Sequence, residues 1–198
     1  MKSKTIPSQQ TGSSFDVCEQ LTSVNARDAG QRYLKACEHL LDINHWGIFA
    51  GEAPDTFILT DSLGNPIERA PKIGDHIKIH LPGPRSTISD GADWVRIEKI
   101  TDRKVAEEQF TALTVRPCNH PHLAAKKVAH FYDDGSTNTF IVHLRGLEVS
   151  ASIHGRNETT NTDANWIEVI RNLLVALPAK AGLSDPHWQK LARGLIED

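Results

Sequence analysis

Hydrophobic and polar residues alternate most regularly over residues 137–158, where the sequence reads TNTFIVHLRGLEVSASIHGRNE. This alternation predicts two antiparallel strands with one half-buried face. Gly146 supplies the positive φ that a two-residue turn requires, so Arg145 and Gly146 are predicted to form the turn. In this register His143 lies opposite Glu148 on the outer face. The buried face is predicted to carry Phe140, Val142, Leu144, Leu147, Val149 and Ala151.

Shorter runs typical of strands precede this hairpin. The run over residues 75–81 alternates strictly, with His76, Lys78 and His80 on the outer face. Pro82 ends this strand because proline cannot donate a hydrogen bond to a neighbouring strand. Further strands are predicted at residues 46–50, 56–60, 92–100, 110–115 and 128–132.

Apolar residues recur at helical spacing near both ends of the chain. A short helix is predicted over residues 15–24, followed by a longer one over residues 27–42 with Asn25 as its N-cap. Two further helices, over residues 164–177 and 185–196, are predicted to form a helical hairpin. The pattern predicts an α+β fold with an N-terminal helix, a curved, barrel-like and mainly antiparallel sheet, and a C-terminal helical hairpin packed on the sheet.

Composition and charge are those of an ordinary globular protein. The chain of 198 residues is 39% hydrophobic and 24% charged, which fits a single domain over residues 15–198 after a polar, disordered tail over residues 1–14. A net charge of −3 argues against a nucleic-acid partner. No apolar run reaches the roughly 20 residues of a membrane span, and no export signal is visible, so we expect a cytoplasmic protein. Ile141, expected on the outer face, leaves a homodimer open.

The densest polar cluster follows the hairpin. His154, Arg156, Asn157 and Glu158 fall within five positions. In one interpretation His154 is a catalytic base, Glu158 or Asp133 is its partner, and Arg156 anchors an anionic group. In the other, Arg156, Asn157 and Glu158 hold the connection to the C-terminal helix through hydrogen bonds with the backbone.

A second candidate segment is the loop over residues 82–94, which is predicted to close over a pocket. Asp93 and Trp94 stand at its end, where the next strand begins, and are candidate ligand-binding residues together with Arg156 and Asn157. The alternative is that Trp94 belongs to the core and that Asp93 accepts hydrogen bonds within a turn.

Cys118, His120 and His122 form the segment most like a metal site, because a thiolate and two imidazoles bind zinc well. Their spacing is not that of a structural zinc module, and a loop without a metal or cofactor is the alternative. The chain has three cysteines, and this odd number fits reduced thiols in the cytoplasm.

Four short segments are similar to stretches in small uncharacterised bacterial proteins. They are residues 82–84, 90–95, 139–142 and 154–158, and the resemblance extends over about half of the chain. It implies no activity.

The function predicted from the sequence is non-enzymatic: an accessory protein that binds a small molecule or another protein at the polar cluster together with the loop over residues 82–94. No phosphate-binding glycine loop, dinucleotide fingerprint or hydrolase nucleophile motif is present. The alternative is a hydrolase-like enzyme, with or without a metal ion, that uses the His, Arg and Glu side chains of this cluster.

Overall fold

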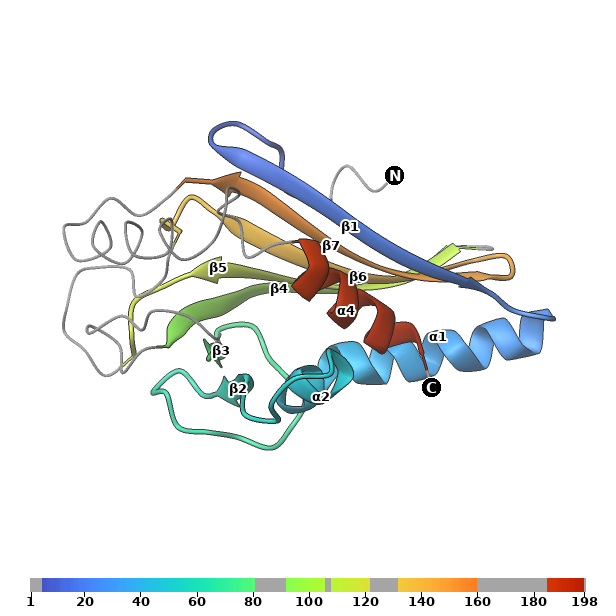
Figure 1. Ribbon diagram of the computed structural model, residues 1–198, viewed down its shortest axis with the longest axis horizontal. Helices are drawn as coiled ribbons and strands as arrows, with labels where there is room; N and C mark the ends of the chain where they lie inside the picture. The colour runs from blue at the N-terminus through green and yellow to red at the C-terminus, as the bar shows by residue number, and fades with distance from the viewer. Residues whose placement is uncertain (1–4, 81–91, 106–107, 122–131, 160–184, 198) are drawn as a thin grey trace.

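A curled, antiparallel sheet of seven strands forms the frame of the described part of the protein (Figure 1). The computed structural model describes residues 5–80, 92–105, 108–121, 132–159 and 185–197. The strands are β1 (Ser13–Thr22), β2 (Phe57–Thr60), β3 (His76–Ile79), β4 (Asp93–Val105), β5 (Glu108–Pro117), β6 (Thr137–Arg145) and β7 (Glu148–Glu158).

The strand order is β1-β7-β6-β5-β4-β3-β2, so the strands from β2 to β7 lie beside their neighbours in the sequence. Strand β1 instead pairs with β7 and joins the two halves of the chain. The helix predicted over residues 15–24 is therefore wrong, because this segment is β1. Val17 and Leu21 are four residues apart, a spacing that fits one face of a helix and also one face of a strand. Val24, the third residue of the expected helical stripe, is exposed.

Helix α1 (Ala26–Leu41) packs against β6 and β7, and it begins where the Asn25 side chain accepts a hydrogen bond from the backbone of Asp28 at 2.9 Å. A short 3-10 turn, η2 (Ile43–His45), and helix α2 (Trp46–Phe49) follow. The strand predicted over residues 46–50 is wrong, because a short apolar run does not distinguish a buried strand from a buried helical turn.

Helix α4 (Asp185–Ile196) lies across the sheet and contacts β1, β7, α1 and α2 (Figure 1). Its buried side is formed by Trp188, Leu191, Ala192 and Leu195, as the sequence predicted. The helix predicted over residues 164–177 lies outside the described residues. None of the described helices is long and apolar enough to cross a membrane.

The hairpin of β6 and β7 has a different register from the predicted one. Arg145 pairs with Glu148, so Gly146 and Leu147 form the turn, and Leu147 is exposed. Each residue pairs with a partner two positions away from the predicted one. Because side chains alternate between the faces with a period of two, the other residues of the predicted buried face still lie on that face. The predicted pair of His143 and Glu148 is not formed.

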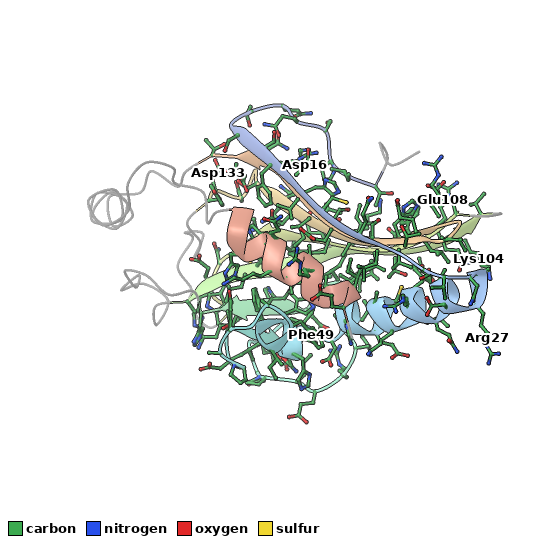
Figure 2. The ribbon with its side chains drawn as sticks, turned by 45° about the vertical axis from the view of Figure 1, so that its right-hand side comes forward. Asp16, Arg27, Phe49, Lys104, Glu108 and Asp133 are labelled. Atoms are coloured by element: carbon green, nitrogen blue, oxygen red, sulfur yellow. The ribbon has the colours of Figure 1, made fainter. Side chains whose placement is uncertain are left out.

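His143 instead contacts Glu108 of β5, with 2.7 Å between Nε2 and Oε1. Glu108 lies at the opposite end of the sheet from Asp133, as Figure 2 shows. The neighbouring Ile141 is buried rather than exposed, and it lines a small pocket with Thr5 from the N-terminal segment. Ile141 therefore offers no exposed apolar position for a homodimer.

Candidate functional site

A cavity of about 30 Å³ lies between the sheet and helices α2 and α4. Six of the seven strands contribute residues to its walls. The cavity therefore lies on the concave side that the curl of the sheet creates. Its volume corresponds to about two water molecules. The described residues that line it are Trp46, Phe57, Ile77, Ile79, Asp93, Val95, Val115, Tyr132, Asn138, Phe140, Glu158 and Trp188.

Aromatic rings form one wall of this cavity. The ring centroids of Trp46 and Phe140 are 4.6 Å apart, and those of Phe140 and Trp188 are 5.7 Å apart. Phe57 contacts both tryptophans edge-on or tilted, at 5.6 and 6.4 Å. Tilted and edge-to-face pairs at these distances are favourable beyond their buried area. The rings therefore form a connected cluster that holds α2 and α4 to the sheet.

Polar side chains line the cavity as well. Asp93 and Asn138 reach it because each lies two residues before an apolar wall residue on its strand, Val95 or Phe140. Asn138 Oδ1 is buried and has no hydrogen-bond partner among the described residues. A buried polar atom without a partner is uncommon in native proteins and calls for a physical reason.

Tyr132 and Glu158 belong to the same polar group of the cavity and hydrogen-bond each other. Burial raises the pKa of the Tyr132 hydroxyl, and the charge and hydrogen bond of Glu158 and the charge of Asp93 raise it further. The tyrosine therefore stays protonated and donates to the Glu158 carboxylate. Ser13 Oγ lies 3.5 Å from the second carboxylate oxygen of Glu158.

Glu158 faces the cavity because of a β-bulge in β7. Ser13 pairs with Glu158 and Phe15 pairs with Gly155, so two steps along β1 correspond to three along β7. The bulge contains Asn157, whose φ of 56° is a left-handed conformation that asparagine adopts more readily than most residues. Without it, alternation would turn Glu158 to the outer face of the sheet, the face that carries His154 and Arg156.

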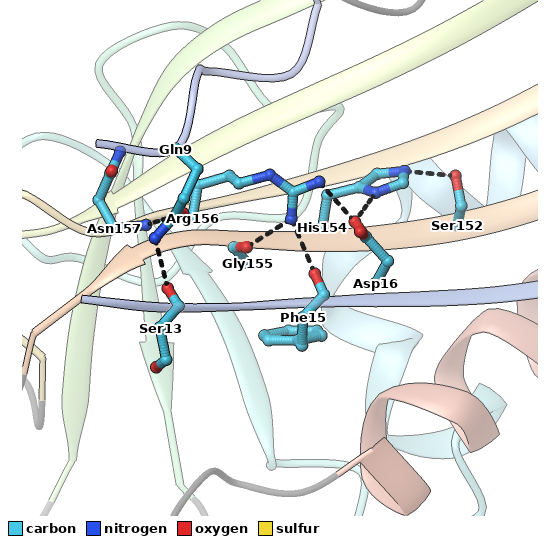
Figure 3. A network of polar contacts seen from close by, with 9 residues as sticks. All are labelled: Gln9, Ser13, Phe15, Asp16, Ser152, His154, Gly155, Arg156 and Asn157. Atoms are coloured by element: carbon cyan, nitrogen blue, oxygen red, sulfur yellow. Dashed lines mark hydrogen bonds and ion pairs between the residues drawn. The ribbon is translucent and has the colours of Figure 1, made fainter. Parts of the chain in front are cut away.

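His154 belongs to a separate network on the outer face of β1 and β7 (Figure 3). Its Nδ1 lies 2.5 Å from Asp16 Oδ1, and its Nε2 lies 2.9 Å from Ser152 Oγ. Arg156 donates to the same Asp16 oxygen at 2.6 Å and to the backbone carbonyls of Phe15 and Gly155. Burial raises the pKa of Asp16, but the hydrogen bonds from His154 and Arg156 outweigh it, so the pKa is lowered.

Asn157 holds the N-terminal segment against the end of β7 (Figure 3). Its side-chain oxygen accepts hydrogen bonds from the backbones of Gln10 and Thr11, at 2.6 and 3.2 Å. Its backbone N–H donates to the Gln9 side chain at 2.9 Å. Asn157 and Arg156 thus make backbone contacts like those that the second interpretation of the polar cluster expected, but the partners are β1 and the N-terminal segment.

The predicted site residues therefore divide between two faces of the sheet. Asp93 and Glu158 line the cavity, whereas His154 and Arg156 lie on the outer face with Asp16. Asp133 accepts a hydrogen bond from the backbone N–H of Gly135 within its own turn, at 2.9 Å.

Of the residues expected to bind metal, Cys118 and His120 lie near Trp94. The Trp94 ring is buried and packs against His120 with centroids 4.7 Å apart. Burial raises the pKa of the Cys118 thiol to about 12, which opposes the thiolate form that a metal requires. His122 and residues 81–91 of the predicted loop lie outside the described residues. In the described part of the chain no three His, Cys, Asp or Glu side chains gather as metal ligands.

The sequence did not mark Asp16, Asn138 or Ser152 as candidate site residues. All three lie in strands, where a lone polar residue resembles any solvent-facing position. Asp16 had a usable signal, since strict alternation from Phe15 to Val17 would have placed it on the outer face of a strand.

No protein-family model matches the sequence, and no curated protein matches it. Among solved structures, the chain is similar to the hypothetical protein jhp0584 from Helicobacter pylori, with 10% sequence identity and a TM-score of 0.47. The match covers 94% of this chain and 87% of that chain. That protein is described only as hypothetical, so no function follows from the likeness.

Proposed function

We propose that this protein is a non-enzymatic binding protein for a small, mainly apolar molecule, held in the cavity between the sheet and helices α2 and α4. The observation that carries this proposal is the buried Asn138 Oδ1, which lacks a partner among the described residues at the wall of an aromatic cavity. Binding sites for small molecules commonly combine apolar walls with a few such polar groups. A hydrogen-bond donor on the ligand would satisfy this oxygen.

The size of the cavity limits the ligand. About 30 Å³ accommodates a group of two or three heavy atoms, so a larger molecule, isobutanol included, requires the Trp188 side chain or helix α4 to move. Compact branched alcohols are therefore suitable probes, because they combine an apolar body with one donor.

The proposal predicts that isobutanol binds in the cavity. In ¹H–¹⁵N spectra, titration with isobutanol is expected to shift the indole N–H signals of Trp46 and Trp188 in a saturable manner. The signal of Trp94 should stay in place, because its ring lies on the other side of β4. Asn138→Leu removes the acceptor and should weaken binding about 5- to 10-fold, in line with one lost hydrogen bond.

Asn119→Leu is the matched control, because Asn119 is exposed and lies outside the cavity lining. This variant should bind isobutanol as the wild type does. Equal shifts of all tryptophan signals, or no saturation, would show that the cavity does not bind such molecules.

A second candidate function, ester hydrolysis, is favoured by the contacts of His154. Asp16 holds Nδ1, so Nε2 is in position to accept the proton of Ser152. In this reaction Ser152 Oγ attacks the ester carbonyl carbon and its proton passes to His154. The proton then leaves with the departing alcohol, and water hydrolyses the acyl-serine to the acid. Ser152 is only 3% exposed, so this reaction requires the outer face to open and admit the ester to the hydroxyl.

If the protein hydrolyses esters, a small fluorophosphonate is expected to label Ser152. Mass spectrometry of the intact protein and of its peptides would detect this adduct. Ser152→Ala should abolish the adduct, and Asp16→Asn should slow its formation. Ser150→Ala is the control, because Ser150 lies on the same face of β7 and is equally buried. Absence of an adduct, or an adduct that persists in Ser152→Ala, would rule this candidate out.

A further inference from the structure

We infer that the ligand of the cavity carries a positively charged amine, an inference that rests on the proposed binding function. It concerns the class of molecule that the cavity prefers. The charges, the acceptors and the aromatic rings that surround the space all favour such a ligand.

The charged side chains among the described lining residues are acidic. Asp93 and Glu158 both belong to the lining, and none of the other described lining residues is a lysine, arginine or histidine. Glu158 is buried, so its charge is screened less than that of a surface carboxylate. A cationic group beside it gains a charge-assisted hydrogen bond, which is about twice as strong as one between neutral groups.

The hydrogen-bonding groups of the described lining residues are mainly acceptors. Asn138 offers its unpartnered Oδ1, and the Tyr132 hydroxyl donates to Glu158. An ammonium group has three donors and no acceptor, so it suits two or more acceptors at once. A ligand carboxylate would instead bring like charge toward Glu158 and Asp93, which is unfavourable.

The aromatic rings favour the same class of ligand. Trp46, Phe57, Phe140 and Trp188 expose ring surface to the cavity. A cation within about 6 Å of a ring centroid is attracted to the ring, most strongly by tryptophan. The alkyl part of an amine packs on the same rings, so one compact alkylamine satisfies both the apolar and the acidic parts of the lining.

Three probes of one shape test this inference: isobutylamine, isobutanol and isobutyrate. Near pH 7 the amine is protonated, as a lysine side chain is. Saturable shifts of the Trp46 and Trp188 indole signals are expected at an amine concentration at least tenfold lower than for the alcohol, and isobutyrate should not bind. Glu158→Gln keeps the side-chain volume and should reduce the preference for the amine to less than about threefold.

Glu148→Gln is the control, since Glu148 lies at the opposite end of β7. It should leave the preference unchanged. Thermal unfolding without ligand separates a loss of binding from a loss of folding, and Asp93→Asn gives an independent second variant. If isobutanol binds as tightly as the amine, or isobutyrate binds more tightly, the inference is wrong while the proposed function stands. If none of the probes binds, both are wrong.

Discussion

Replacing Gly194 by alanine is expected to destabilise the protein by about 1–3 kcal/mol, the usual cost of inserting a methyl group where there is no space. Gly194 lies in α4, and a Cβ atom at this position would overlap the backbone carbonyl of Phe49 in α2. A backbone atom cannot rotate away as a flexible side chain does. Helix α4 would therefore have to shift from α2, and the contacts of Trp188 and Leu191 with the sheet would weaken.

Gly30→Ala is the matched control for this substitution. Gly30 lies within α1, and an added Cβ meets no atom within 4 Å. There alanine should stabilise the protein by about 0.5–1 kcal/mol, because it is the better helix former. Urea unfolding followed by tryptophan fluorescence measures both variants. A Gly194→Ala variant as stable as the wild type would mean that α4 does not pack this closely on α2.

The regular part of the fold was predictable because its signals are local. Strand β3 and the buried face of the hairpin follow from alternation alone, and α1 follows from helical spacing and its Asn25 cap. The position of β1 was not predictable in this way. Its pairing with β7 joins residues such as Asp16 and His154, which are 138 positions apart, and no local pattern specifies that contact.

The candidate site was predictable in its residue types but not in its geometry. The cluster from His154 to Glu158 stood out by composition, but one bulged residue decides which face each side chain takes. Because Asn157 has a positive φ, the Glu158 side chain points into the cavity and away from His154. A bulge depends on the pairing of two distant strands, so closeness in the sequence alone grouped these side chains into one site. Aromatic residues such as Trp46 and Phe140 were visible in the sequence, but the sequence did not indicate that they surround a common space.

Replacing Trp188 by alanine is expected to destabilise the protein by about 3–5 kcal/mol, the range for large aromatic side chains removed from a core. Trp188 is 7% exposed and lies between Phe15, Phe57 and Phe140, with ring centroids 5.7–6.5 Å away. Its loss enlarges an apolar cavity that the surrounding strands fill only in part. Thermal and urea unfolding measure this effect directly, and Trp188→Phe, which keeps one ring, should lose less.

The same variant tests whether the cavity can hold a ligand. Apolar cavities left by truncation of large side chains bind aromatic molecules of matching size. Free indole should therefore raise the melting temperature of Trp188→Ala, because a ligand that binds only the folded state stabilises it by mass action. The wild type, in which the Trp188 ring occupies this space, should not respond at the same indole concentration. If indole stabilises both proteins equally, it binds elsewhere. If it stabilises neither and Trp188→Ala unfolds cooperatively, the strands and helices close over the space, and α4 is then an adjustable wall of the cavity.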